Sequence, residues 1–200
     1  MSQKYQEDRV IGMDIMDAVD RAAMITAEIV GSISEDQFSL PTPCSEWTVR
    51  DVLNHLLLGD LLCLAWIRGE TPPDRDVDHL GADPKASVLK GLADTRAELS
   101  APGALARTVS TRMGQMSVAK LAERRIADLV AHLWDLAVAT SHPTGYDPEL
   151  VDFVETHYRA RLGSKPREGA PIAEIQPVPP DATAADRLAG YLGRTVDTAP

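Results

Sequence analysis

The stretch IADLVAHLWDLAVA, residues 126–139, decides the fold of this chain. Asp128, His132 and Asp135 are its only polar side chains, and at about 100° per residue all three fall within about 60° of one another on a helix. A helix that is apolar on nearly all sides is normally buried, so burying these groups costs free energy that a partner must offset. The stretch therefore predicts a buried helix whose polar groups hold a ligand such as a metal ion.

The composition is that of a compact globular protein. The 200 residues are 44% hydrophobic and 25% charged, which is enough for the core of one domain. The formal net charge is −10, and an acidic chain repels nucleic-acid phosphates and anionic membrane surfaces. The longest apolar run, residues 56–67, is interrupted by Asp60 and is shorter than the roughly twenty residues that span a bilayer. We therefore expect a small-molecule substrate as partner, with no nucleic acid and no membrane.

The cysteines and the N-terminal sequence bear on the cellular compartment. Cys44 and Cys63 are too few for a disulfide framework and lack the CxxC spacing of a zinc or redox motif. The first residues are polar and show no basic segment followed by an apolar run. We expect a cytoplasmic protein.

Apolar residues that recur every three or four positions predict six helices. Thr48, Asp83, Ser117 and Asp181 are the expected N-caps of four of them. The predicted helices cover residues 8–30, 48–68, 84–99, 117–140, 148–162 and 181–193. Between the third and fourth, residues 107–116 alternate weakly and carry β-branched side chains, which indicates a short hairpin or an extended link.

Four long helices joined by modest loops favour an all-α fold. The expected architecture is an antiparallel four-helix bundle with extra C-terminal helices and a short hairpin. We expect residues 1–163 to form this helical, metal-binding domain. Residues 164–200 begin with a proline-rich segment, and we expect them to form an extension whose short helix packs on the bundle.

A metal site is expected between two of the helices. Asp128 and His132 are four residues apart, so their side chains lie one above the other and can reach the same ion. His55, on the helix over residues 48–68, is the expected third ligand because the segment after it is apolar nearly all round. A carboxylate with two imidazoles suits zinc, nickel or ferrous iron, of which we expect zinc. Three protein ligands leave a position for water or substrate, which is typical of catalytic sites.

The alternative interpretation of the same spacing is an exposed polar stripe, since Asp and His often lie one turn apart on helix surfaces. The neighbouring positions are Ala127, Ala131 and Trp134. An exposed face would normally carry Lys, Glu or Gln there. The flanking residues therefore favour the ligand interpretation.

Asp135 and Arg125 are the expected catalytic residues beside the metal. Asp135, or alternatively Asp51, is placed to accept a hydrogen bond that fixes a histidine ring. Arg125, or its neighbour Arg124, is placed to hold an anionic group of the substrate.

Three segments resemble a known family. LPTPCSEWTVRDVLNHL (residues 40–56) and ADLVAHLWDLAVAT (residues 127–140) resemble the DinB-like metal-binding four-helix-bundle superfamily. The closest resemblance is to its actinobacterial branch, which includes the mycothiol-dependent maleylpyruvate isomerase N-terminal domain. The ending DATAADRLAGYLGR (residues 181–194) is similar to the terminal segment of small single-domain members.

In that family a histidine on the second helix and an acid and a histidine on a later helix hold the metal. The resemblance thus implies the same ligands, His55, Asp128 and His132, although the isomerase has glutamate where this chain has Asp128. It implies a divalent metal that activates a low-molecular-weight thiol such as mycothiol for attack on a small electrophile, and so a thiol transferase or isomerase. The alternatives are a non-catalytic metal or small-ligand binding protein, and a hydrolase or hydratase that uses metal hydroxide. Because members of the family often pair, the resemblance also implies a homodimer.

Overall fold

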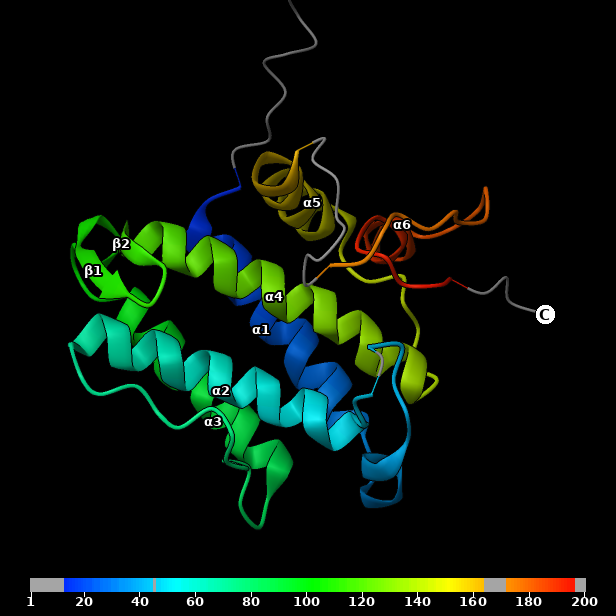
Figure 1. The fold of residues 1–200 in the computed structure, drawn as a ribbon, viewed down its shortest axis with the longest axis horizontal. Helices are drawn as coiled ribbons and strands as arrows, with labels where there is room; N and C mark the ends of the chain where they lie inside the picture. The colour runs from blue at the N-terminus through cyan, green and yellow to red at the C-terminus, as the bar shows by residue number, and fades with distance from the viewer. Residues whose placement is uncertain (1–12, 45, 164–171, 197–200) are drawn as a thin grey trace, which may run out of the picture.

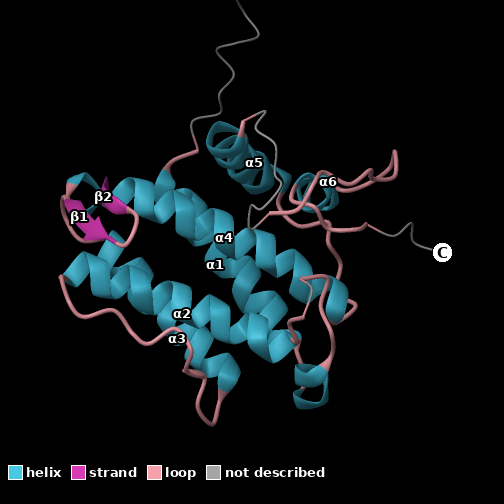
Figure 2. Cartoon of the chain, viewed as in Figure 1, coloured by secondary structure: helices cyan, strands magenta, loops and turns pink. Residues whose placement is uncertain are grey.

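The computed structural model describes residues 13–44, 46–163 and 172–196. The described chain is mostly helical, with one two-stranded hairpin (Figures 1 and 2). The helices are α1 (Ile15–Ser32), α2 (Val49–Arg68), α3 (Pro84–Leu99), α4 (Val118–Ala139), α5 (Pro148–Leu162) and α6 (Ala184–Tyr191), and the strands are β1 (Thr108–Thr111) and β2 (Gly114–Ser117). The all-α class and the short hairpin are confirmed.

Three helices begin where the capping signals predict. Thr48 and Asp51 form a reciprocal capping box at the start of α2. Asp83 accepts a hydrogen bond from the first turn of α3 at 3.0 Å, and Ser117 does the same for α4 at 3.2 Å. Each cap satisfies an amide that has no partner within its own helix, which fixes the first residue of the helix.

The first helix begins later than the sequence pattern predicts. Asp14 accepts a hydrogen bond from the amide of Met16 at 2.8 Å, and α1 begins at Ile15. A carboxylate at this position satisfies a free amide and interacts favourably with the helix dipole. The predicted start, over residues 8–12, lies outside the described residues.

The last helix is capped by a different residue from the one predicted. Thr183, not Asp181, is the N-cap of α6, and it exchanges hydrogen bonds with Asp186 three residues later. The Thr-x-x-Asp spacing allows this reciprocal pair, whereas an N-cap at Asp181 would have Ala184 where the second member of the pair must stand. Residues 172–180 before it have no helix or strand.

Helices α1 to α4 enclose the main core. Helix α1 packs against α3 and α4, and α2 packs against the same two helices. Fully buried side chains from all four helices fill the interior, among them Ile29, Leu53, Leu56, Val88 and Leu133. Helices α2 and α4 run in opposite directions along each other (Figure 1). This packing brings the middle of α2 next to the middle of α4.

The remaining elements cover the ends and one side of this core. Helix α5 packs on α4 and α1, and α6 packs on α5 and α4. Strand β1 contacts α2 and strand β2 contacts α4, so the hairpin lies across one end of these two helices (Figure 1). In the described part of the chain, every helix is too short or too polar to cross a bilayer.

Candidate metal centre

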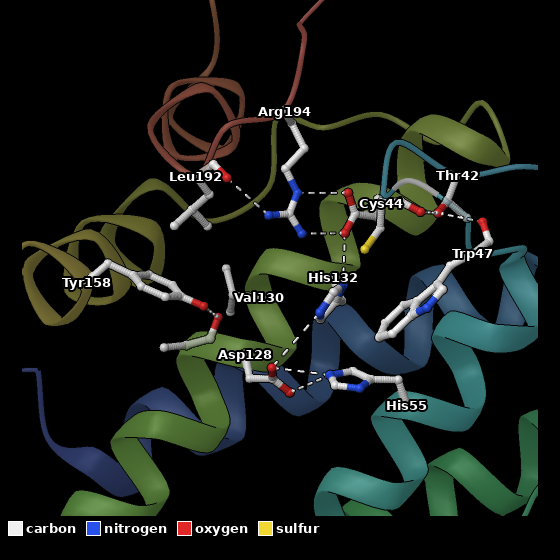
Figure 3. Close-up of polar contacts among 12 residues, drawn as sticks. Thr42, Cys44, Trp47, His55, Asp128, Val130, His132, Tyr158, Leu192 and Arg194 are labelled. Carbon is white, nitrogen blue, oxygen red and sulfur yellow. Dashed lines mark hydrogen bonds and ion pairs between the residues drawn. The ribbon is translucent and has the colours of Figure 1, made fainter. Parts of the chain in front are cut away.

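His55, Asp128 and His132 come together where α2 and α4 pack (Figure 3). The Nε2 atom of His55 lies 3.3 Å and 3.2 Å from the two carboxylate oxygens of Asp128. The Nε2 atom of His132 lies 4.0 Å from Asp128 Oδ1. The two imidazole rings are 4.6 Å apart between their centroids. The three side chains that the sequence singles out therefore face one another across two helices.

These three side chains have the chemistry and spacing of a metal site. One donor atom of each can be chosen so that all three lie within 4.8 Å of one another. Bonds of about 2.0–2.1 Å to a common ion at tetrahedral angles place donor atoms about 3.4 Å apart. The observed separations of 3.2 Å and 4.0 Å lie on either side of that value. The two imidazoles and the carboxylate thus fit a divalent ion such as zinc.

The ring of His132 is held in one orientation from the side facing away from Asp128. Its Nδ1 atom lies 2.9 Å from Asp135 Oδ2. Asp135 is fully buried and also accepts two hydrogen bonds from Arg194, at 3.2 Å and 2.9 Å. Because an ionised carboxylate only accepts, Nδ1 of His132 carries the proton of this hydrogen bond, and Nε2 is the ring atom that faces Asp128. Asp135 thus lies behind a candidate ligand and is not part of the cavity lining.

Asp51, the alternative partner for a histidine ring, does not have that role. Its carboxylate accepts the hydrogen bonds of the Thr48 amide and hydroxyl, at 2.8 Å and 2.6 Å. It is therefore part of the α2 cap.

Arg125 lies beneath Asp128, in a buried ion pair with Asp60 of α2. Its Nε and Nη2 atoms donate to the two oxygens of Asp60 at 2.8 Å and 3.0 Å, and Nη2 also donates to the carbonyl of Leu56 at 2.7 Å. Its Nη1 atom donates to Asp128 Oδ2 at 3.3 Å. A Cβ at Gly59 would lie 3.1 Å from the guanidinium carbon, so this glycine leaves room for the arginine inside the bundle. With its donors used in this way, Arg125 positions Asp128.

The surrounding charges set the ionisation of both carboxylates, Asp128 and Asp135. Burial alone would raise the pKa of Asp128, but the hydrogen bond from His55 and the nearby His132 and Arg125 lower it well below its usual range. Burial alone would also raise the pKa of Asp135, but the hydrogen bonds that it accepts from His132 and Arg194 lower this pKa below its usual value. Both groups are therefore carboxylates at neutral pH, which is the form that binds a metal or fixes a histidine.

Trp47 and Cys44, on the loop before α2, also lie at the site. The Trp47 ring stacks on His132, with centroids 5.6 Å apart, and lies 4.9 Å from the ring of His55 (Figure 3). Cys44 lies close enough to His132 and Asp135 for the three to form a second possible ligand group. From the sequence, core packing is the first interpretation of Trp47 and pocket lining the second. For Cys44 the sequence favours a loop anchor over a thiol nucleophile, because two prolines stand beside it and no histidine is near it in the sequence.

The neighbours of the polar stripe are buried, which contradicts the exposed-stripe interpretation. Ala127, Ala131 and Trp134 are 1%, 6% and 3% exposed. On the stripe itself, the Asp128 side chain is 38% exposed and that of His132 is 11% exposed. These two face a cavity of about 600 Å³, which His55, Trp47 and Cys44 also line.

Comparisons with known proteins place the chain among relatives of similar length. The family described as mycothiol maleylpyruvate isomerase N-terminal domain matches residues 19–137, a range that includes all three candidate ligands. Two proteins of Mycobacterium tuberculosis, from strains CDC 1551 and H37Rv and both named only as uncharacterised, are each 34% identical over 185 residues. The aligned part covers 92% of this chain and 100% of each relative. No solved structure matches the chain.

Proposed function

This chain belongs to the family of the mycothiol maleylpyruvate isomerase N-terminal domain, and we propose that it is a metal-dependent thiol transferase or isomerase. The substrate is a small electrophile, and mycothiol is the thiol co-substrate. His55, Asp128 and His132 are the metal ligands, with zinc as the ion, in a DinB-like bundle formed by α1 to α4. The observation that carries the proposal is the convergence of these three side chains, with the second nitrogen of His132 already fixed by Asp135.

The side chains around the centre have separate roles in this proposal. A bound divalent ion stabilises a thiolate over a thiol, so that a nucleophile is present at neutral pH. Asp135 and Arg194 orient His132, and Arg125 orients Asp128. Trp47 covers the two imidazoles on one side and limits the access of water there.

Metal analysis of the purified protein tests the ligand assignment. Protein prepared without chelator should contain about one equivalent of divalent metal per chain. The variant His55→Ala should lose this metal, because the two remaining ligands, Asp128 and His132, bind an ion far more weakly than three ligands do. His142→Ala is the matched control, since His142 lies outside the cavity and its nearest carboxylate is Glu28 at 3.7 Å. An unchanged metal content in His55→Ala would refute the assignment.

Assays with and without added mycothiol test the reaction class. Electrophile consumption that needs both metal and thiol supports the transferase or isomerase. Turnover that needs metal alone indicates a hydrolase or hydratase. A metal-loaded protein that consumes no electrophile under either condition is a binding protein, and the enzymatic part of the proposal is then wrong.

A further inference from the structure

Six arginines line the cavity above the candidate metal centre. They come from the loop after α2, the hairpin turn, α4, α5 and the segment after α6: Arg75, Arg112, Arg124, Arg125, Arg161 and Arg194. Among the described residues, Asp128 is the only carboxylate in the same lining. The whole chain carries a formal net charge of −10. The cavity is thus strongly positive in a protein that is otherwise acidic.

Four of these arginines have no carboxylate partner among the described residues. Arg125 pairs with Asp60 and Arg194 with Asp135, whereas Arg75, Arg112, Arg124 and Arg161 form no ion pair. Outside the cavity the described arginines that do pair with a carboxylate are Arg21, Arg50, Arg68, Arg96 and Arg159. Among the described residues, carboxylates therefore pair with most of the arginines outside the cavity but with only two of the six that line it.

Arg124 and Arg161 line the same cavity, one from α4 and one from α5. Burial lowers the pKa of Arg124, and the neighbouring charge of Arg161 lowers it further. The one hydrogen-bond acceptor of Arg124 is the thioether sulfur of Met113, at 2.9 Å. Arg161 lies over the ring of Tyr158, 5.8 Å from its centroid. Two like charges that face one cavity are stabilised by an anion that accepts hydrogen bonds from both.

The rest of the lining indicates an organic ligand. Trp47, Trp66, Leu58, Leu62 and Ile172 supply apolar surface to the same cavity. A volume of about 600 Å³ is within the range for small-molecule sites. Guanidinium groups bind the planar or tetrahedral oxygens of carboxylates and phosphates through paired N–H groups.

We propose that Arg124 and Arg161, with Arg75 and Arg112, form a subsite for the carboxylate or phosphate group of a small organic anion. This subsite rests on the proposed function, because it holds the anion in the cavity that the candidate metal ligands line. It narrows the substrate class from any small electrophile to one that carries an oxyanion.

Titration of metal-free protein with simple anions tests the subsite separately from catalysis. Chelator-treated protein is titrated with succinate and with inorganic phosphate, and the fluorescence of Trp47 and Trp66 in the cavity wall reports binding. We expect a saturable change with at least one anion that weakens as salt is added, and none with the neutral diester dimethyl succinate. Saturation by succinate alone identifies a carboxylate, and saturation by phosphate alone identifies a phosphate. A lack of saturation with both anions, or an equal response to the diester, would overturn the proposal.

Substitution of the arginines locates the site. The double variant R124Q/R161Q should bind the anion about tenfold more weakly, because it loses two partly exposed ion pairs. R187Q should bind it like the wild type, since Arg187 also lacks a carboxylate partner but lies on α6 outside the cavity and donates to the carbonyl of Ala182. R112Q, in the hairpin turn away from the helical core, gives a second test should the double variant fold poorly.

The metal content of the variants separates this proposal from the proposed function. R124Q/R161Q should keep the metal of the wild type, because neither arginine bonds to a candidate ligand. A double variant that binds metal and anion as the wild type does would refute the subsite and leave the metal centre intact. Anion binding that depends on Arg124 and Arg161 in a protein that takes up no metal would support the subsite and refute the metal centre.

Discussion

Asp60 and Arg125 form a buried ion pair directly below a candidate metal ligand. The side chains are 1% and 6% exposed, so neither charge is stabilised by bulk water. Their attraction offsets the cost of desolvation only while both are present. The pair also holds Asp128 in place through the third donor of Arg125. Asp60 therefore affects the position of Asp128 through Arg125, without contacting Asp128 itself.

Asp60→Asn should remove the ion pair with Arg125 and so weaken the positioning of Asp128. Arg125 would keep its charge without its main partner, and we expect the free energy of unfolding to fall by about 3–5 kcal/mol. Metal affinity should fall about 10- to 100-fold, as when groups that orient metal ligands are removed. Urea unfolding and metal titration measure the two effects. Asp152→Asn on the exposed face of α5 is the control. An Asp60 variant as stable as this control would contradict the role given to the pair.

The two cysteines should differ in their reaction with iodoacetamide. Burial raises the pKa of Cys63 to about 12, and its residue is 4% exposed, so it should react only after unfolding. Burial also raises the pKa of Cys44, as does nearby Asp135. Since the thiolate is the reactive form, labelling of the half-buried Cys44 should be slow and should keep rising above the usual thiol pKa of about 8.5. Peptide mass spectrometry locates the label. Rapid labelling of Cys63 in the folded protein would count against this packing.

Helix starts could be predicted because their signals are local. The caps at Thr48, Asp83 and Ser117 involve residues within three positions of one another, so the sequence alone identifies them. The same holds for the pair of Asp128 and His132, one helical turn apart. The choice of Asp181 over Thr183 was wrong because two cap-type residues stand two positions apart, and the reciprocal hydrogen bonds with Asp186 decide between them.

The contact between α6 and the extended segment before it depends on a glycine. A Cβ at Gly190 would contact Val178 Cγ1 and would lie 3.1 Å from the carbonyl oxygen of Gln176. Gly190→Ala should therefore push the segment away and lower the free energy of unfolding by about 1–3 kcal/mol. Gly31→Ala near the end of α1 is the matched control, because nothing lies within 4 Å of its Cβ. This control should be neutral or stabilising by up to about 1 kcal/mol.

Both effects can be read from urea unfolding curves. Equal stability of Gly190→Ala and Gly31→Ala would show that the segment before α6 does not pack as described.

Across the whole molecule, a metal that joins α2 to α4 should stabilise the folded state. A ligand that binds only the folded chain at about a thousand times its Kd adds about 4 kcal/mol. Chelation should therefore lower the Tm, and adding back zinc should restore it. Differential scanning calorimetry of wild type and His55→Ala measures this difference. A chelator effect of the same size in His55→Ala would mean that the ion binds elsewhere.

The parts of the centre that the sequence did not reveal come from long-range packing. Trp47 and Cys44 reach His132 because the loop before α2 folds over α4, and Arg194 reaches Asp135 because α6 packs there. No spacing along the chain encodes these contacts. The sequence did carry a signal for Asp60, because an acid inside an apolar run needs a buried cation as partner. That this cation is Arg125 could be identified only from the packing of α2 against α4.

The hydrogen bond between Asp135 and Arg194 spans 59 positions, and this separation sets an order of events during translation. The ribosome adds His55, Asp128 and His132 well before it adds Arg194. Until then the buried carboxylate of Asp135, which fixes the ring of His132, lacks its cation, even if α1 to α4 have already packed together. The nascent protein thus holds all three candidate ligands before Asp135 gains its cation, and the docking of α6 completes the support of His132.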